Sequence, residues 1–210
     1  MNSNSVQPIT SASRAVFYRE KAAGFYRVSP YTLGQSVAEL PYLTLQVIIY
    51  TVLVYFMIGF RTSAVLFWEF FLIEWLTLNA FTYFGILTVY LTPILPLGSL
   101  LASWFFSMWN LFSGFLIALP RVPHYWIWLY YGNPVAYAIR AIIQSNLVRS
   151  GGTVSVPIST TETAEVDLDK YLKEEVGLEK QYLWRDIGIL IMFAVVFRVG
   201  AMIAIRYINF

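Results

Sequence analysis

The sequence predicts an all-α, polytopic membrane protein built as a helical bundle, and three observations support this fold class. Of the 210 residues, 58% are hydrophobic and 12% are charged, whereas soluble domains carry about 25% charged residues. Four apolar stretches are each long enough to cross a hydrocarbon core of about 30 Å as a helix. Aromatic residues make up 18% of the chain, which is typical where rings lie at membrane interfaces.

Two tight connections separate the first three of the four predicted spans. The spans cover about residues 37–60, 65–91, 95–116 and 184–208. Gly59 and the four residues after it form a short turn, so the first two spans are predicted to be a helical hairpin. Pro93 and Pro96 are predicted to end one helix and begin the next, because proline lacks the N–H that a helix interior needs.

A long connection, about residues 117–183, separates the third and fourth spans and is predicted to be extracellular. It starts with a dense aromatic patch, and Pro134 then opens an apolar stretch that is too short to cross the membrane. A re-entrant or interfacial helix fits this stretch best. The polar segment that follows is predicted to be a water-exposed loop with one short helix near residues 167–176.

The N-terminal part is predicted to contain a disordered segment, residues 1–13, and an amphipathic cytoplasmic helix that precedes the first span. The segment before that span holds Arg14, Arg19, Lys21 and Arg27. Short basic flanks stay on the cytoplasmic side of a membrane. With four spans, both termini are therefore predicted to be cytoplasmic.

Several classes of chemistry are excluded by composition. The chain has no cysteine and one histidine, so neither a metal site nor a catalytic site is predicted. No Gly-x-x-x-x-Gly-Lys-Ser/Thr phosphate loop occurs, so the chain is not predicted to be an enzyme or to hold a cofactor. A net charge of +2 with dispersed basic residues argues against nucleic acid as a partner.

Six ordered motifs resemble a known family. They are RAVFYREKAAGFY (14–26), ELPY (39–42), NLFSGF (110–115), PRVP (120–123), YYGNPVAY (130–137) and RYINF (206–210). Together they look like the G subfamily of ABC transporters, of the pleiotropic drug resistance type. The resemblance covers residues 14–210, which would be part of an ABC-2 type transmembrane domain.

The resemblance implies a transport function. The four spans would be the third to sixth of a six-span domain in an ATP-driven exporter of amphipathic, lipid-like or xenobiotic small molecules. ATP and Mg would be bound by an ABC ATPase domain absent from this chain. The other partners implied are a second transmembrane domain, membrane lipid and the small amphipathic substrate. The plasma membrane is the expected location.

Arg19 and Glu20 are the candidate coupling residues, because the family uses this helix to contact the ATPase domain. The alternative from the residues alone is a positive-inside anchor with interfacial aromatic residues.

Ser103, Ser107 and Asn110 are spaced four and three residues apart, so they share one face of the third span. By resemblance this face would line a substrate cavity, with Phe115 and Leu116 as an apolar plug above it. The alternative is helix–helix packing through small polar residues, which is common in membranes.

Glu39, Glu74 and Arg198 are ionisable residues within spans, where an unpaired charge is costly. We expect Arg198 to pair with Glu74 or Glu39 in an intramembrane polar relay. The alternative is that Arg198 extends to the cytoplasmic interface and the acidic residues face solvent.

Two other functions remain open at this level. One is a subunit of a channel or secondary transporter, which would show charged rings or paired broken helices. The other is a non-functional truncated fragment.

Overall fold

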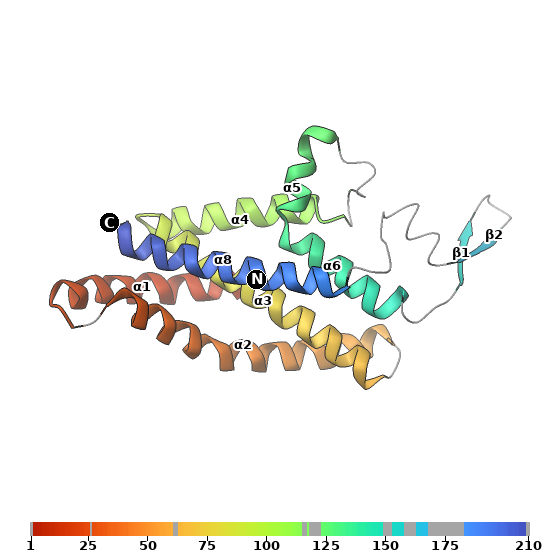
Figure 1. Ribbon diagram of the computed structural model, residues 1–210, viewed down its shortest axis with the longest axis horizontal. Coiled ribbons are helices and arrows are strands. Elements are labelled where there is room, and N and C mark those ends of the chain that lie inside the picture. The colour runs from red at the N-terminus through yellow and green to blue at the C-terminus, as the bar shows by residue number, and fades with distance from the viewer. Residues whose placement is uncertain are drawn as a thin grey trace. The chain divides into compact units, whose positions relative to one another are not determined.

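The computed structural model describes most of the chain as helix (Figure 1). The described residues are 2–25, 27–60, 63–114, 117, 123–148, 153–157, 163–167 and 183–208. They form two compact units. The first unit contains residues 1–50, 75–107 and 190–210, and the second contains residues 51–74 and 108–189.

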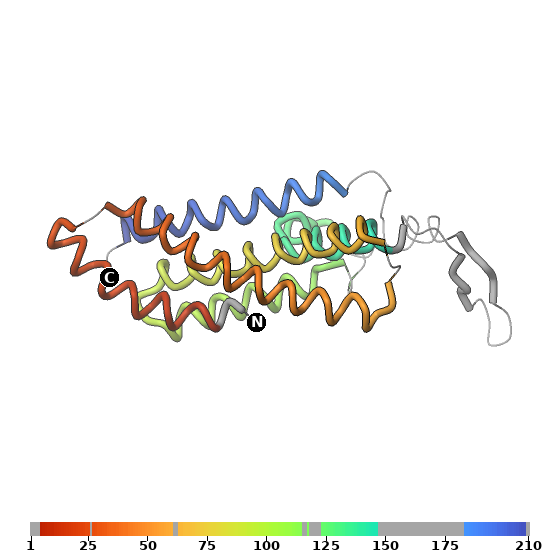
Figure 2. Tube along the Cα trace, turned by 90° about the horizontal axis from the view of Figure 1, so that it is seen from below, coloured from red at the N-terminus to blue at the C-terminus, as the bar shows by residue number. Residues whose placement is uncertain are grey.

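Three helices of the described part are long and apolar enough to cross a membrane: α2 (Val28–Ile58), α3 (Ala64–Leu91) and α8 (Leu183–Tyr207). Figure 2 shows α8 as one unbroken helix. Helix α4 (Leu95–Leu111) has 17 residues and is about 26 Å long at 1.5 Å per residue. The predicted helical fold is therefore confirmed, and three of the described helices could cross a membrane, whereas the predicted count of four spans is not confirmed.

Helix α2 begins nine residues before the predicted start at residue 37. Pro30 lies in its first turn, where a backbone N–H has no helical partner and its loss costs little. The Thr32 hydroxyl donates to the carbonyl oxygens of Val28 at 3.1 Å and Ser29 at 3.0 Å. These local bonds support a helical turn that hydropathy alone does not indicate.

Helix α4 ends at Leu111, five residues before the predicted end of the third span at residue 116. Phe112 N still donates to Met108 O at 3.0 Å, and Gly114 then adopts a φ of 87°. A glycine with positive φ is a common way to end a helix. The plug candidates Phe115 and Leu116 lie outside the described residues.

Helix α1 (Asn2–Ala22) occupies the segment that was predicted to be disordered, residues 1–13. Serine-rich sequence and an internal proline, Pro8, disfavour an isolated helix. Burial overrides this preference, since Val6, Gln7 and Thr10 are all buried in the first unit. Tertiary contacts rather than local propensity therefore explain this helix.

The second unit contains the connection between α4 and α8. A 3₁₀ turn (His124–Trp126) leads into α5 (Ile127–Tyr131) and α6 (Pro134–Ile143), which continues as a π-helical turn (Gln144–Val148).

Two strands follow these helices where the sequence predicted only loop and helix (Figure 1). Strand β1 (Thr153–Pro157) pairs antiparallel with β2 (Thr163–Asp167), so that Thr153 lies opposite Asp167. The β-branched residues of these two segments favour strands. The described chain is thus helical with one added hairpin. The short helix predicted near residues 167–176 lies, beyond Asp167, outside the described residues.

Candidate functional site

Helix α1 is joined to α3 and α4 by a buried glutamine in the first unit. Gln7 Nε2 donates to Thr88 Oγ1 at 3.1 Å, and Ser99 Oγ donates to Gln7 Oε1 at 2.9 Å. Gln7 is 1% exposed, and an unpaired amide at such a position would be costly. Because both ends of the amide are paired, Gln7 connects α1 to two helices at one point.

Arg14 caps the C-terminal end of α3. Its Nη1 donates to the carbonyl oxygens of Val89 at 2.7 Å and Thr92 at 2.6 Å, and its Nη2 donates to Pro93 O at 2.8 Å. The last carbonyls of a helix lack helical donors and carry partial negative charge. The guanidinium supplies both donors and positive charge, so Arg14 ties α1 to the turn between α3 and α4.

The C-terminal part of α1 contacts the end of α8. The Tyr18 hydroxyl donates to Ile208 O at 2.7 Å, and Lys21 Nζ donates to Arg206 O at 3.4 Å. Burial raises the pKa of Tyr18 above its ordinary value of 10.0, although the charge of Arg14 opposes the shift. The hydroxyl therefore stays protonated and keeps its role as a donor near neutral pH.

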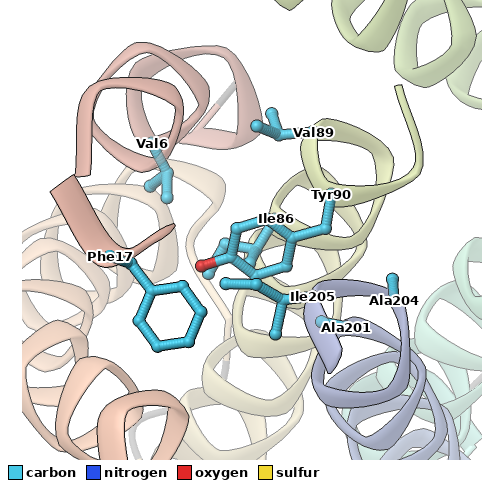
Figure 3. Packing of buried hydrophobic residues seen from close by; sticks show 8 residues of the cluster. All are labelled: Val6, Phe17, Ile86, Val89, Tyr90, Ala201, Ala204 and Ile205. Atoms are coloured by element: carbon cyan, nitrogen blue, oxygen red, sulfur yellow. The ribbon is translucent and has the colours of Figure 1, made fainter. Parts of the chain in front are cut away.

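An apolar cluster completes the contact between α1, α3 and α8 (Figure 3). Phe17 of α1, Tyr90 of α3 and Ile205 of α8 belong to it and are fully buried. Packed interiors have few voids and transmit displacement rather than absorbing it. The cluster therefore packs α1 against the adjoining parts of α3 and α8.

The predicted coupling residues lie on this helix. Arg19 is exposed and Glu20 is half-buried. The contacts that anchor α1 are made by Gln7, Arg14 and Tyr18, which the sequence did not single out for these roles. Their partners are distant in the chain, so no local pattern could reveal them.

Two of the three relay candidates, Arg198 and Glu39, lie in the first unit. Arg198 Cζ lies 5.4 Å from the ring centroid of Tyr83, and its charge acts on Glu39. Among the described residues, no direct ion pair joins Arg198 to Glu39. A cation over an aromatic face is favourable where water is scarce, so Tyr83 is a partner of Arg198 that the sequence pattern does not predict.

Glu74 belongs to the second unit and is half-buried. Another acidic residue of α3, Glu69, accepts a hydrogen bond from Ser145 Oγ at 2.8 Å within that unit. This contact links α3 to the π-helical turn after α6.

The candidate cavity residues Ser103, Ser107 and Asn110 are all exposed on α4. The Ser107 hydroxyl donates to Ser103 O at 2.9 Å, so it is satisfied by its own helix. On the buried side of α4, Ala102 and Phe106 are 0% and 4% exposed. The polar residues thus lie away from the packed side of α4.

A buried ion pair joins α6 to the start of α8 in the second unit. Arg140 Nε donates to Asp186 Oδ2 at 2.5 Å, and Nη2 donates to Oδ1. Arg140 Cζ also lies 4.8 Å from the centroid of the Tyr137 ring. Burial disfavours the charged form of Arg140, but the hydrogen bonds and charge of Asp186 outweigh it and raise the pKa of Arg140.

Asn133 fixes the start of α6. Its Oδ1 accepts from Val135 N at 2.9 Å, and its Nδ2 donates to Trp109 O at 2.6 Å. Asn133 is fully buried. One side chain therefore caps α6 and attaches it to the last turn of α4.

Replacing Asn133 by alanine is expected to lower the free energy of unfolding by about 1–3 kcal/mol, because a helix cap and a buried bond are lost together. Denaturation of the purified protein in mixed detergent micelles measures the change. Asn133→Asp is the control, because it keeps the cap at Val135 and loses the donor to Trp109. An alanine variant as stable as the parent would contradict the role of this residue.

Comparison with known proteins agrees with the helical membrane architecture. The family described as ABC-2 type transporter matches residues 1–147, and the family described as CDR ABC transporter matches residues 148–210. The chain is 38% identical over 210 residues to ABC transporter G family member 35 of Arabidopsis thaliana. It is 36% identical over 209 residues to pleiotropic drug resistance protein 1 of Nicotiana tabacum.

Both alignments cover 100% of this chain and 14% of the relative's length. The chain is therefore similar to a small part of much longer proteins. Its match to a family of membrane proteins is consistent with the three helices of the described part that are long and apolar enough to cross a membrane. The chain belongs to the ABC-2 type transporter family, and its relatives are plant ABC transporters of the G family and pleiotropic drug resistance type.

Proposed function

We propose that this chain is the membrane-spanning part of an ATP-driven exporter of small amphipathic, lipid-like or xenobiotic molecules. The name of the tobacco relative, pleiotropic drug resistance protein 1, is consistent with such substrates. ATP and Mg would be bound by an ABC ATPase domain outside this chain. A second transmembrane domain would complete the pore.

The observation that carries the proposal is the attachment of α1 to the ends of other helices. Arg14 holds the α3–α4 turn, Gln7 holds α3 and α4, and Tyr18 holds the residue after α8. A push on α1 would therefore reach several membrane helices at once. Arg19 and Glu20 would receive that push from the ATPase domain, and hydrolysis would bias a two-state arrangement of the helices.

The proposed topology has four spans, with α4 and the residues after it as the third. Helix α6 would be the re-entrant helix of an extracellular connection. Both termini would be cytoplasmic, in a protein of the plasma membrane. The basic residues of α1 and the α1–α2 turn support this orientation.

The proposed substrate cavity is lined by Ser103, Ser107 and Asn110 of α4, with Phe115 and Leu116 as its apolar plug. The exposure of the three polar residues supports this assignment. Polar groups are unfavourable against lipid, so a face that carries them is better suited to a water-filled pathway or a partner domain.

A polar relay is proposed around Arg198. Tyr83 and Glu39 would both interact with the positive charge of Arg198, and Glu74 is a further candidate member of the relay. This arrangement keeps the arginine inside the protein, where intramembrane charges are tolerated.

The experiment that tests the function is a substitution at the centre of the α4 face. Ser107→Trp in the full-length protein that carries this chain should lower export of a fluorescent amphipathic substrate about tenfold or more. A bulky side chain in a small-molecule site would displace a bound molecule. Transport and ATP hydrolysis are measured in the same proteoliposomes.

Leu101→Trp is the matched control, because Leu101 is 41% exposed on the same helix and lies about 120° around it from Ser107. It should leave export close to that of the parent. Equal effects of the two substitutions would show that the Ser107 face does not line the pathway. Unchanged export in both, with no dependence on ATP, would contradict the exporter proposal itself.

A further inference from the structure

A cavity of about 820 Å³ lies in the first unit, where α1 ends, α2 begins and α8 ends. Its basic lining residues are Lys21, Arg27 and Arg206, and its other walls include Val28, Met202 and Tyr207. The contacts that couple α1 to α3 use none of these side chains. The cavity is therefore separate from the contacts of α1 with α3 and from the α4 face, and it shares only Lys21 and Arg206 with the contact between α1 and α8.

The charge of the cavity is one-sided. Three cationic residues line it, and none of the described residues that line it is acidic. The first turn of α2 also contains no acidic residue. Like charges held together repel each other unless an anion lies between them. Guanidinium and ammonium groups are the side chains that bind phosphate oxygens best.

Two of the three cations keep most of their donors for a ligand. Lys21 uses one donor in its 3.4 Å contact with Arg206 O, and an ammonium group has three. The Arg206 guanidinium lies 5.3 Å from the ring centroid of Tyr207, a stacking contact that leaves its in-plane N–H groups available. Arg27 is exposed at the rim.

The other walls identify the kind of anion. Val28, Met202 and Ile203 provide an apolar surface beside the cations, and they lie at the ends of α2 and α8, two helices that can cross a membrane. A free phosphate ion has no apolar part that could contact such a surface, whereas a phospholipid carries both a phosphate and acyl chains. The volume also falls within the range of about 300–1,000 Å³ that ligand sites show.

We propose that this cavity binds the headgroup of an anionic phospholipid, with Lys21, Arg27 and Arg206 around the phosphate and Met202 and Ile203 against the acyl chains. Basic pockets at the ends of membrane helices bind such headgroups. The lipid would hold the last turn of α1 against the end of α8. This site is separate from the proposed export pathway and does not depend on it.

The test is a phosphatidylserine titration of the full-length protein that carries this chain, with retained lipid measured by native mass spectrometry. Phosphatidylcholine is titrated in parallel. Changing Lys21, Arg27 and Arg206 together to glutamine should weaken phosphatidylserine binding by on the order of 100-fold, about fivefold for each cation. Phosphatidylcholine binding should not change.

Arg19→Gln is the matched control, because it removes one positive charge from the same helix outside the cavity. It should alter phosphatidylserine affinity by no more than about twofold, as expected for a screened surface charge. The exchange of Lys21 to arginine and of both arginines to lysine should retain binding. Arg27→Gln alone, at an exposed position, should cost about fivefold even if the triple variant does not fold.

Three results would overturn the proposal. The first is equal affinity for phosphatidylserine and phosphatidylcholine. The second is an Arg19→Gln effect as large as that of Arg27→Gln, which would indicate a general surface field. The third is displacement of the lipid by inorganic phosphate, which would indicate a site for a free anion.

Discussion

Replacing Arg140 by alanine should lower the free energy of unfolding by about 3–5 kcal/mol, the usual cost of leaving a buried charge without its partner. Asp186 is fully buried, and both of its carboxylate oxygens accept hydrogen bonds from Arg140. Without the guanidinium, the buried carboxylate would lose the hydrogen bonds and the positive charge that Arg140 supplies. Denaturation in mixed detergent micelles, followed by tryptophan fluorescence, measures the loss.

Arg185→Ala provides the control for this prediction. Arg185 Nε lies 3.5 Å from the same carboxylate, but its side chain is 49% exposed, so its removal should cost less than about 1 kcal/mol. The double change Arg140→Met with Asp186→Leu should be milder than Arg140→Ala, because it removes both buried charges. If Arg140→Ala costs no more than Arg185→Ala, the ion pair does not hold α6 to α8.

The long apolar helices could be predicted because their lengths follow from the bilayer. The predicted second span, residues 65–91, differs by one residue from α3 (Ala64–Leu91), and the predicted fourth span, residues 184–208, is shifted by one residue at each end from α8 (Leu183–Tyr207). The end of α3 could also be predicted from the sequence, because Pro93 prevents the helix from continuing. In these helices most residues must be apolar because they face lipid or the protein interior, so the local hydropathy of the sequence is enough to predict them.

Hydropathy failed where backbone geometry decides the structure. Residues 112–116 are apolar enough to extend the third span, but α4 ends at Leu111 and Gly114 adopts a positive φ. The start of α2 was not predicted because its first turns are too polar for a hydropathy-based span. The helix nevertheless includes them, and the Thr32 hydroxyl donates to carbonyl oxygens of the same helix. Hydropathy indicates which residues favour lipid, but it does not indicate where capping begins or ends a helix.

The contacts of the candidate site could not be predicted, because their partners are far apart in the chain. Arg14 and Val89 are 75 residues apart, and Arg140 and Asp186 are 46 residues apart. In the sequence, Arg14 is one of several basic residues before a predicted span, and this pattern predicts only the orientation in the membrane. Which of these arginines is buried against carbonyl oxygens depends on tertiary packing.

The second large effect is expected at Arg14. Arg14→Met should lower the free energy of unfolding by about 3 kcal/mol, because carbonyl oxygens of buried Val89 and Thr92 lose charge-assisted bonds of about 1.5–3 kcal/mol each. Methionine keeps much of the apolar contact along α1, so the loss reports on the guanidinium. Arg19→Met, at an exposed position of the same helix, should change stability by less than about 0.5 kcal/mol.

A purely structural role and a coupling role for Arg14 differ in a measurable way. If α1 moves the α3–α4 turn through this guanidinium, Arg14→Met should reduce the number of substrate molecules exported per ATP hydrolysed in the full-length protein. Arg14→Lys should restore part of that ratio, because an ammonium can still donate to one or two of the three carbonyls. A less stable protein that exports the parental number of molecules per ATP would show that Arg14 only supports the fold. Since Arg14 contacts the turn and α1 also carries the exposed Arg19 and the half-buried Glu20, a lowered ratio would place the path of coupling through this helix.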